Sequence, residues 1–112
     1  MTSIVDILRA HRFAFTSELE LQDGIASLLS RLPGYLREEY LSATDRPDFR
    51  IGGTVVEVKV DGSLSALVRQ VGRYARYDVV EEIVVVTSRR RLAVLPESIG
   101  GKPVAAVVVG AL

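Results

Sequence analysis

The chain has 112 residues, of which 48% are hydrophobic and 25% are charged, as in an ordinary globular protein and unlike a disordered one. Its 14 basic residues balance its 14 acidic residues, so any nucleic-acid binding has to come from local patches. The lack of cysteine excludes disulfides and cysteine zinc sites and favours a reducing, cytoplasmic location. The sequence has neither an apolar run of about 18 residues, as a membrane span requires, nor a signal-peptide pattern. We therefore expect one domain over residues 1–112, without a membrane partner.

The first third of the chain is expected to be helical. Residues 3–12 have the apolar spacing of a short helix. A longer helix is expected to begin after Ser17, because Glu20 follows three residues later as in a capping box, and to end before Pro33. Residues 35–42 are then expected to form a strand.

The second half of the chain is expected to consist mainly of strands, because every valine except Val5 follows residue 54. Residues 47–51 and 54–60 have strand composition and are separated by the pair Gly52-Gly53. Two short strands joined by two glycines are typical of a tight β-hairpin. The sequence therefore predicts a hairpin at the centre of the chain.

A helix and two further strands are expected after the hairpin. Ser63 is suited to cap a helix over residues 64–78, and residues 83–87 are uniformly apolar, as in a strand covered on both faces. Residues 104–109 form the last expected strand. A strand, a helix and a strand in this order favour a parallel crossover, which places the chain in the α/β class with a mixed sheet flanked by helices.

The predicted hairpin brings two acidic residues together. If Gly52-Gly53 form a two-residue turn, Asp48 lies opposite Glu57, and strand alternation puts Lys59 on the same sheet face. Carboxylates at opposed positions repel unless a cation lies between them. Their oxygens, together with the carbonyl of Val58, are the hard ligands that Mg²⁺ or Mn²⁺ prefers. A metal ion, two carboxylates and an ammonium group suit the attack of water on a phosphodiester.

A simpler interpretation fits the same spacing. Charged residues at alternate positions of a strand usually mark a solvated face, on which Glu57 and Lys59 would interact only weakly. The opposition of Asp48 and Glu57 also depends on the expected turn. Both interpretations stay open at this point.

Pro47-Asp48 followed by Glu57-Val58-Lys59 resembles the motif of the PD-(D/E)XK superfamily, the restriction-endonuclease-like nucleases. In that family the motif also lies on a hairpin. The resemblance implies a restriction-endonuclease-like core of order α-β-β-β-α-β, which would cover about residues 16–110. It also implies a nuclease that uses Mg²⁺ or Mn²⁺.

Two helical features add to this resemblance. Glu18 lies in the helix before the hairpin, as does an acidic metal ligand in many members of the superfamily, and Glu20 competes for this role. We prefer Glu18 because it shares the apolar stripe of its helix, although either glutamate also suits the first turn of a helix as a partner of the helix dipole. Gln70 and Tyr74 resemble the QxxxY motif of the exonuclease-type branch.

The resemblance assigns a role to each matched residue. It implies that Asp48, Glu57 and the carbonyl of Val58 bind the catalytic metal ion, and that Glu18 holds a second ion or its water. It implies that Lys59 orients the attacking water or helps to deprotonate it. These residues would make the protein a phosphodiester hydrolase.

Several polar residues are candidates for contact with nucleic acid. The resemblance implies that Gln70 and Tyr74 either touch DNA or support Lys59, whereas a helix flank partly under solvent explains the pair equally well. Arginines on the same helix and around the hairpin are suited to meet phosphates; these are Arg73, Arg46 and Arg50. The run of arginines at 89–91 is more typical of a solvated loop than of a phosphate clamp.

The expected function is metal-dependent cleavage of DNA, with RNA not excluded. Small stand-alone members of the superfamily include dimeric Holliday-junction resolvases, and no domain for reading sequence is evident, so junctions or ends are the favoured substrates and a homodimer is the favoured assembly. The neutral net charge argues against a free-standing junction binder. The alternative is a catalytically silent, nuclease-like module for nucleic-acid binding or assembly.

Overall fold

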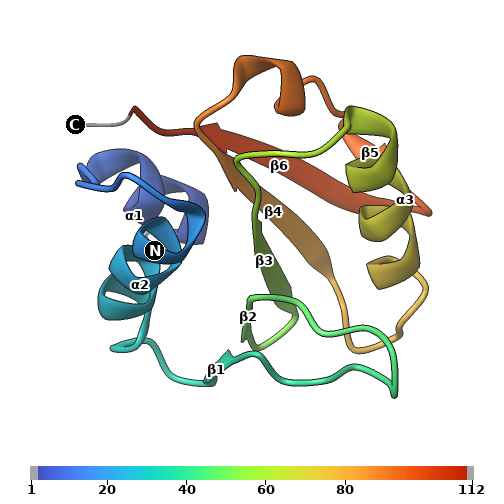
Figure 1. Cartoon of the computed structure of the whole chain (residues 1–112). Helices are drawn as coiled ribbons and strands as arrows, with labels where there is room; N and C mark the ends of the chain where they lie inside the picture. Colours follow the sequence, from blue (N-terminus) through green and yellow to red (C-terminus); the bar gives the residue numbers. More distant parts are fainter. Residues whose placement is uncertain (1–2, 111–112) are drawn as a thin grey trace.

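The structure, a computed structural model, describes residues 3–110, so that residues 1–2 and 111–112 of the expected domain lie outside the described part. It has a six-stranded mixed sheet with helices on both faces (Figure 1). The helices are α1 (Ile4–Ala10), α2 (Glu18–Leu29), α3 (Leu64–Tyr74) and the short 3₁₀ helix η1 (Arg90–Leu92). The strands are β1 (Tyr35–Arg37), β2 (Phe49–Ile51), β3 (Thr54–Val58), β4 (Glu82–Thr87), β5 (Ser98–Ile99) and β6 (Lys102–Val108).

The strand order in the sheet is β1-β2-β3-β4-β6-β5. Strands β3, β4 and β6 run parallel, and the strands at both edges are antiparallel to their neighbours. The mixed α/β class predicted from the sequence is therefore confirmed. Within residues 3–110, no helix has both the length and the apolar character needed to cross a bilayer.

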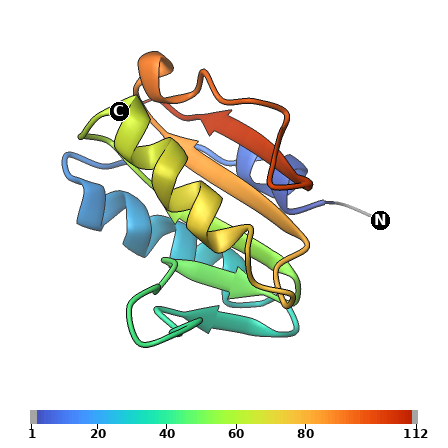
Figure 2. The same ribbon diagram turned by 90° about the vertical axis from the view of Figure 1, so that its right-hand side faces the viewer.

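Two hydrophobic clusters hold the helices to the sheet, one on each face. Helices α1 and α2 pack on the face that carries Phe49 and Val56, and α3 packs on the face that carries Val55 (Figures 1 and 2). Strand β4 contributes to both clusters, and all of its residues after Glu82 are buried. Its uniformly apolar sequence is explained by this double burial.

The expected helix starts are confirmed by their caps. The Ser17 hydroxyl accepts a hydrogen bond from the Glu20 N–H at 3.1 Å, and the Ser63 hydroxyl accepts one from the Ala66 N–H at 3.1 Å. These bonds satisfy donors that a first helical turn otherwise leaves free. Helix α3 ends at Tyr74, earlier than residue 78, because the chain tightens there into turns of the 3₁₀ type.

The hairpin has the register that the sequence predicts. Phe49 pairs with Val56, Arg50 with Val55 and Ile51 with Thr54 across a two-residue turn. The first turn residue, Gly52, has φ +58°, a conformation that favours glycine. Since the register is as expected, Glu57 lies on the α3 face and its neighbours on the strand lie on the α2 face.

Two strands differ from the sequence-based expectation. Strand β1 ends at Arg37 rather than at residue 42, because Glu38 takes a left-handed conformation with φ +56° and starts a long loop. The last strand, β6, begins at Lys102 rather than at residue 104, and its first two residues pair with the two-residue strand β5.

Candidate active site

The centre of the candidate site is the pair of carboxylates on Asp48 and Glu57. The Asp48 N–H donates to Glu57 Oε1 at 3.4 Å, and Asp48 Oδ2 accepts from the Val58 N–H at 2.8 Å. Glu57 is only 4% exposed, whereas Asp48 is partly exposed. The hairpin thus holds the two carboxylates at adjacent positions, with one of them deep in the protein.

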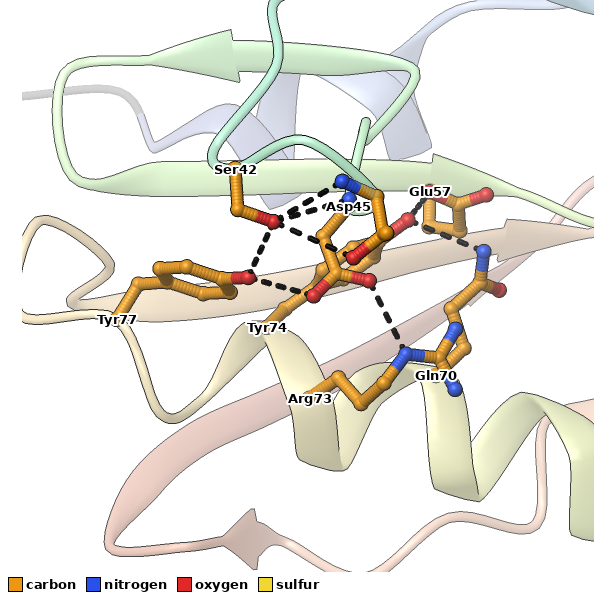
Figure 3. A network of polar contacts seen from close by, with 8 residues as sticks. Ser42, Asp45, Glu57, Gln70, Arg73, Tyr74 and Tyr77 are labelled. Carbon is orange, nitrogen blue, oxygen red and sulfur yellow. Dashed lines mark hydrogen bonds and ion pairs between the residues drawn. The ribbon is translucent and has the colours of Figure 1, made fainter.

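A tyrosine from α3 donates a hydrogen bond to the buried carboxylate of Glu57. The Tyr74 hydroxyl donates to Glu57 Oε1 at 2.9 Å, and Gln70 Nε2 donates to the Tyr74 hydroxyl at 3.0 Å (Figure 3). Tyr74 is 1% exposed. The Tyr74 side chain, expected either to touch DNA or to support Lys59, is thus buried in the protein, where its hydroxyl contacts Glu57. Gln70 lies at the margin of the same network.

Glu18 from α2 also reaches the site. Its Oε1 accepts a hydrogen bond from the Val60 N–H at 3.0 Å, just after the end of β3. Glu20 points elsewhere, since its carboxylate accepts from the N–H and hydroxyl of Thr16. Of the two glutamates considered for this position, Glu18 is the one that the structure brings to the hairpin.

Lys59 lies on the same side of the sheet as the two carboxylates. Its N–H donates to the Val86 carbonyl at 2.9 Å, which fixes its backbone to β4, and its side chain is partly exposed. Its positive charge lowers the pKa of both Asp48 and Glu57, against the larger effect of burial. The ammonium group is therefore part of the electrostatic environment of the pair.

Burial dominates the electrostatics of the carboxylates. Burial, together with the charge of Asp48, raises the pKa of Glu57 to about 8, although the hydrogen bond from Tyr74 opposes the shift. Burial also raises the pKa of Asp48; the Val58 N–H opposes this, and the charge of Glu18 adds to it. In the absence of a cation, the pair therefore favours a bound proton near neutral pH.

The raised pKa of Glu57 predicts how the stability of the metal-free protein depends on pH. The group binds a proton more tightly when folded than when unfolded, so its contribution to the free energy of unfolding falls as pH rises from about 4.5 to about 8. Glu57→Gln removes this loss. We expect denaturant melts in EDTA to find the variant more stable than wild type near pH 9, by at least about 1.4 kcal/mol, the value of one pKa unit.

The comparison near pH 5 is the internal control for that measurement. There most of the Glu57 carboxyl is protonated in the folded protein, and the advantage of Glu57→Gln should shrink. An advantage of equal size at both pH values would contradict the burial argument.

The donor atoms suit a hard divalent cation. Glu57 Oε2 and Glu18 Oε2 accept no hydrogen bond from residues 3–110, and Asp48 Oδ1 has only a 3.4 Å bond from Gln22. Mg²⁺ is commonly held by one or two carboxylates and several waters, so these free oxygens fit it. Within residues 3–110, no three acidic or histidine side chains converge into a ready-made metal site. A metal ion would thus need ligands besides the carboxylates of Asp48 and Glu57, from the backbone or from water.

The Val58 carbonyl points to the side of β3 on which Asp48 lies. The N–H and C=O of one strand residue point to the same side, and the Val58 N–H points to Asp48. Because β2 begins only at Phe49, this carbonyl lies beyond the paired part of the hairpin. Its orientation is the one expected for a ligand beside Asp48.

The arginines expected to meet phosphates lie around the loop of residues 38–47 and on the sheet. Arg73 Nε donates to Asp45 at 3.1 Å, with half of the Arg73 side chain exposed. Arg46 is exposed and its guanidinium lies over the ring of Tyr40. Its Nη1 is 3.9 Å from Glu38 Oε2. Arg50 is partly buried on β2, and its Nε has no hydrogen-bond partner within residues 3–110. Within residues 3–110, no ion pair joins these three arginines to Asp48 or Glu57.

The sequence did not indicate the cluster that anchors this loop. Asp45 is 7% exposed and accepts from the Tyr77 hydroxyl at 2.6 Å, and the Ser42 hydroxyl accepts from the Asp45 N–H at 3.2 Å (Figure 3). The bond from Tyr77, with the help of Arg73, lowers the pKa of Asp45. The cluster ties the segment just before Asp48 to α3 and so fixes where that carboxylate lies.

Helical spacing was the available signal for one missed residue. Gln22, whose Nε2 donates to Asp48 Oδ1 at 3.4 Å, follows Glu18 by four on α2. Residues three and four apart share a helix face. Asp45 had no such signal, because it lies in an irregular loop.

An open cleft of about 530 Å³ lies beside the carboxylates. Glu18 and Val60 line the cleft and also contact each other at the candidate site. Asp48, Glu57 and Lys59 do not line the cleft. The carboxylate pair therefore lies outside the lining of this cleft, and Glu18 connects the two.

No protein-family model matches the chain, and comparisons with curated proteins and with solved structures find no match either. The resemblance to the PD-(D/E)XK superfamily therefore depends on the motif and on the geometry described above.

Proposed function

We propose that the protein is a metal-dependent nuclease that hydrolyses phosphodiester bonds, with DNA as the substrate. The observation that carries this proposal is the position of Glu57 against Asp48, held by the hairpin register and by Tyr74 with Lys59 beside them. A buried pair of like charges is costly without a cation. Keeping it next to an ammonium group and an open cleft is understandable if the pair serves chemistry.

Each residue has a role in this proposal. Asp48, Glu57 and the Val58 carbonyl would hold Mg²⁺ or Mn²⁺, and Glu18 would bind a second ion or its water. The metal, when bound, supplies a Lewis acid that activates water and stabilises the charge on phosphate oxygens. Lys59 orients the attacking water and offsets negative charge that develops on the phosphate.

The order of elements supports the finer fold assignment. Helix α2, strands β1 to β3, helix α3 and strand β4 follow one another in the order α-β-β-β-α-β that a restriction-endonuclease-like core requires. The candidate residues lie on α2, at the start of β2 and at the end of β3. We propose this core for the chain on the basis of that order and of the motif.

A panel of labelled substrates tests the proposed activity. Supercoiled plasmid, linear duplex, a flap, a four-way junction and RNA are each incubated with the protein in Mg²⁺ and in EDTA. The proposal predicts cleavage in Mg²⁺ alone, and the preferred substrate identifies the structure that is recognised. Equal results in Mg²⁺ and EDTA for all substrates would contradict it.

A silent binding module is the alternative function. The lack of a convergent three-ligand site within residues 3–110 favours it. The same panel separates the two functions, because a silent module binds one of the substrates, as a gel-shift assay can measure, and cuts none.

We also expect a homodimer, joined through the outer side of β6. On the side of β6 that faces away from β4, the Val104 N–H donates to the Glu97 carbonyl. The N–H of Ala106 on this side has no strand partner within residues 3–110. The Ala106 carbonyl accepts only a long bond of 3.5 Å from Arg9 Nη2, so this edge is largely open within residues 3–110. An open strand edge with apolar side chains favours pairing with a second copy. Sedimentation at high micromolar concentration should therefore find a dimer, and a monomer would contradict this prediction.

A proline variant locates the expected interface. The Val109 N–H points to β4, so the N–H of Ala106 points outward by strand alternation. Ala106→Pro removes this outward donor and keeps the bonds to β4. The variant should sediment as a monomer, whereas an unchanged dimer would place the interface elsewhere.

A further inference from the structure

The open cleft lies where two parallel strands end. Val60 and Asp61 follow β3, Ser88 and Arg89 follow β4, and the segment that enters α2 lines the third side of the cleft. The crevice outside the carboxyl ends of parallel strands is the usual place for a ligand in an α/β sheet. The volume of about 530 Å³ is within the range of small-molecule sites, which is about 300–1,000 Å³.

Arg89 is held in place at this cleft. Its Nε donates to the Val60 carbonyl at 3.1 Å, and one terminal nitrogen is 4.0 Å from the carboxylate of Asp61. The Asp61 side chain is 84% exposed, so this ion pair is weak. An arginine fixed through Nε presents its two terminal nitrogens together, which is the geometry that binds a phosphate in a bidentate manner.

The other walls suit the remaining parts of a nucleotide. Phe15 and Val60 supply apolar surface, and Thr16, Ser17 and Ser88 supply hydroxyls. A sugar and a base offer both an apolar face and hydrogen-bonding edges. The cleft therefore has a cation, apolar surface and hydroxyl groups in one place, together with the carboxylates of Glu18 and Asp61.

Glu18 connects the cleft to the candidate active site. It lines the cleft, its Oε1 accepts from the Val60 N–H, and its charge acts on Asp48. A strand whose reacting phosphate lies at the carboxylates would therefore place its next nucleotide in the cleft.

We infer that this cleft binds one unpaired nucleotide of the substrate, next to the phosphate that is cleaved, with Arg89 on its outer phosphate. This inference depends on the proposed function. It makes a single strand or a frayed end the preferred ligand, because the cleft has the volume of a small-molecule site and not of a surface for a duplex.

Fluorescence anisotropy with labelled oligothymidine tests the inference in EDTA, where metal-dependent cleavage does not occur. Wild type should bind the single strand more tightly than the same strand annealed to oligoadenosine. Arg89→Ala should weaken single-strand binding by about tenfold, as expected for one charge-assisted hydrogen bond. It should also reduce the slope of log affinity against log salt by about 0.7, the value for one phosphate on a single strand.

Two further variants make the result specific. Arg90→Ala removes a neighbouring exposed arginine that lies outside the cleft, and it should leave affinity and salt slope nearly unchanged. Ser88→Asp places a negative charge in the cleft while keeping Arg89, so it should weaken binding even if Arg89→Ala fails to fold. Oligouridine in the same assay decides whether the cleft accepts ribose as well as deoxyribose.

Equal losses in Arg89→Ala and Arg90→Ala would overturn the inference, as would tighter binding of the duplex or no binding of single strands. Failure of the proposed function has a different signature. In that case single strands bind through Arg89, yet Mg²⁺ produces no cleavage of any substrate.

Discussion

Lys59→Ala is expected to reduce the rate of phosphodiester cleavage by about 10²- to 10⁴-fold, to near the background, while the fold stays intact. The side chain is partly exposed on the face of the carboxylates, so its loss leaves no cavity in the core. The backbone bond from its N–H to the Val86 carbonyl remains in an alanine. Initial rates in Mg²⁺ and a thermal melt of each protein measure the two effects.

The only other lysine of the chain is the matched control. Lys102 Nζ donates to the carbonyls of Tyr77 and Val80, and so holds the turn between α3 and β4. Lys102→Ala should therefore lower the melting temperature and keep the cleavage rate of the folded protein. Wild-type cleavage by Lys59→Ala would contradict the mechanism, and so would an equal loss of rate in both variants.

Asp48→Asn is expected to remove the stabilisation by Mg²⁺ without weakening the metal-free protein. The amide oxygen can still accept from the Val58 N–H, and the repulsion with Glu57 is relieved. In EDTA the variant should equal wild type or exceed it by roughly 0.2–1 kcal/mol, the scale of a cross-strand pair. Mg²⁺ at a hundredfold excess over Kd should stabilise wild type by about 2.7 kcal/mol, and the variant much less.

Thermal melts of both proteins, with EDTA and with Mg²⁺, measure this difference. Asp78→Asn, which changes an exposed carboxylate just after α3, should retain the full Mg²⁺ shift of wild type. An equal shift in Asp48→Asn would mean that Asp48 is not a ligand and that the interpretation of the hairpin is wrong.

The hairpin was predictable because its signals are local. Gly52-Gly53 define the turn, and alternation in the following strand then fixes which residues lie opposite each other. The positions of Asp48 and Glu57 followed from this register alone. Helix starts were predictable for the same reason, since the serine caps are adjacent in sequence to the donors that they satisfy.

The surroundings of the pair were not predictable, because they depend on contacts between distant segments. The orientation of Tyr74 is set by the packing of α3 on β3, and a helical pattern alone does not say which partner a polar residue on the helix flank will meet. Asp45 lies in a loop whose path depends on the left-handed conformation of Glu38 and on Tyr77 from the turn after α3. The cleft likewise arises where the ends of separate elements meet.

The rate of Mg²⁺-dependent cleavage by Glu57→Gln tests the central claim most directly. The variant keeps an acceptor for the Tyr74 hydroxyl and is expected to be at least as stable as wild type without metal, so a lost rate cannot come from unfolding. Measured on the best substrate of the panel, the rate should fall about a hundredfold or more, whereas Glu97→Gln, a change at an exposed glutamate, should cleave like wild type. Cleavage by Glu57→Gln at the wild-type rate would contradict the assignment of this carboxylate pair as a metal-dependent hydrolytic site.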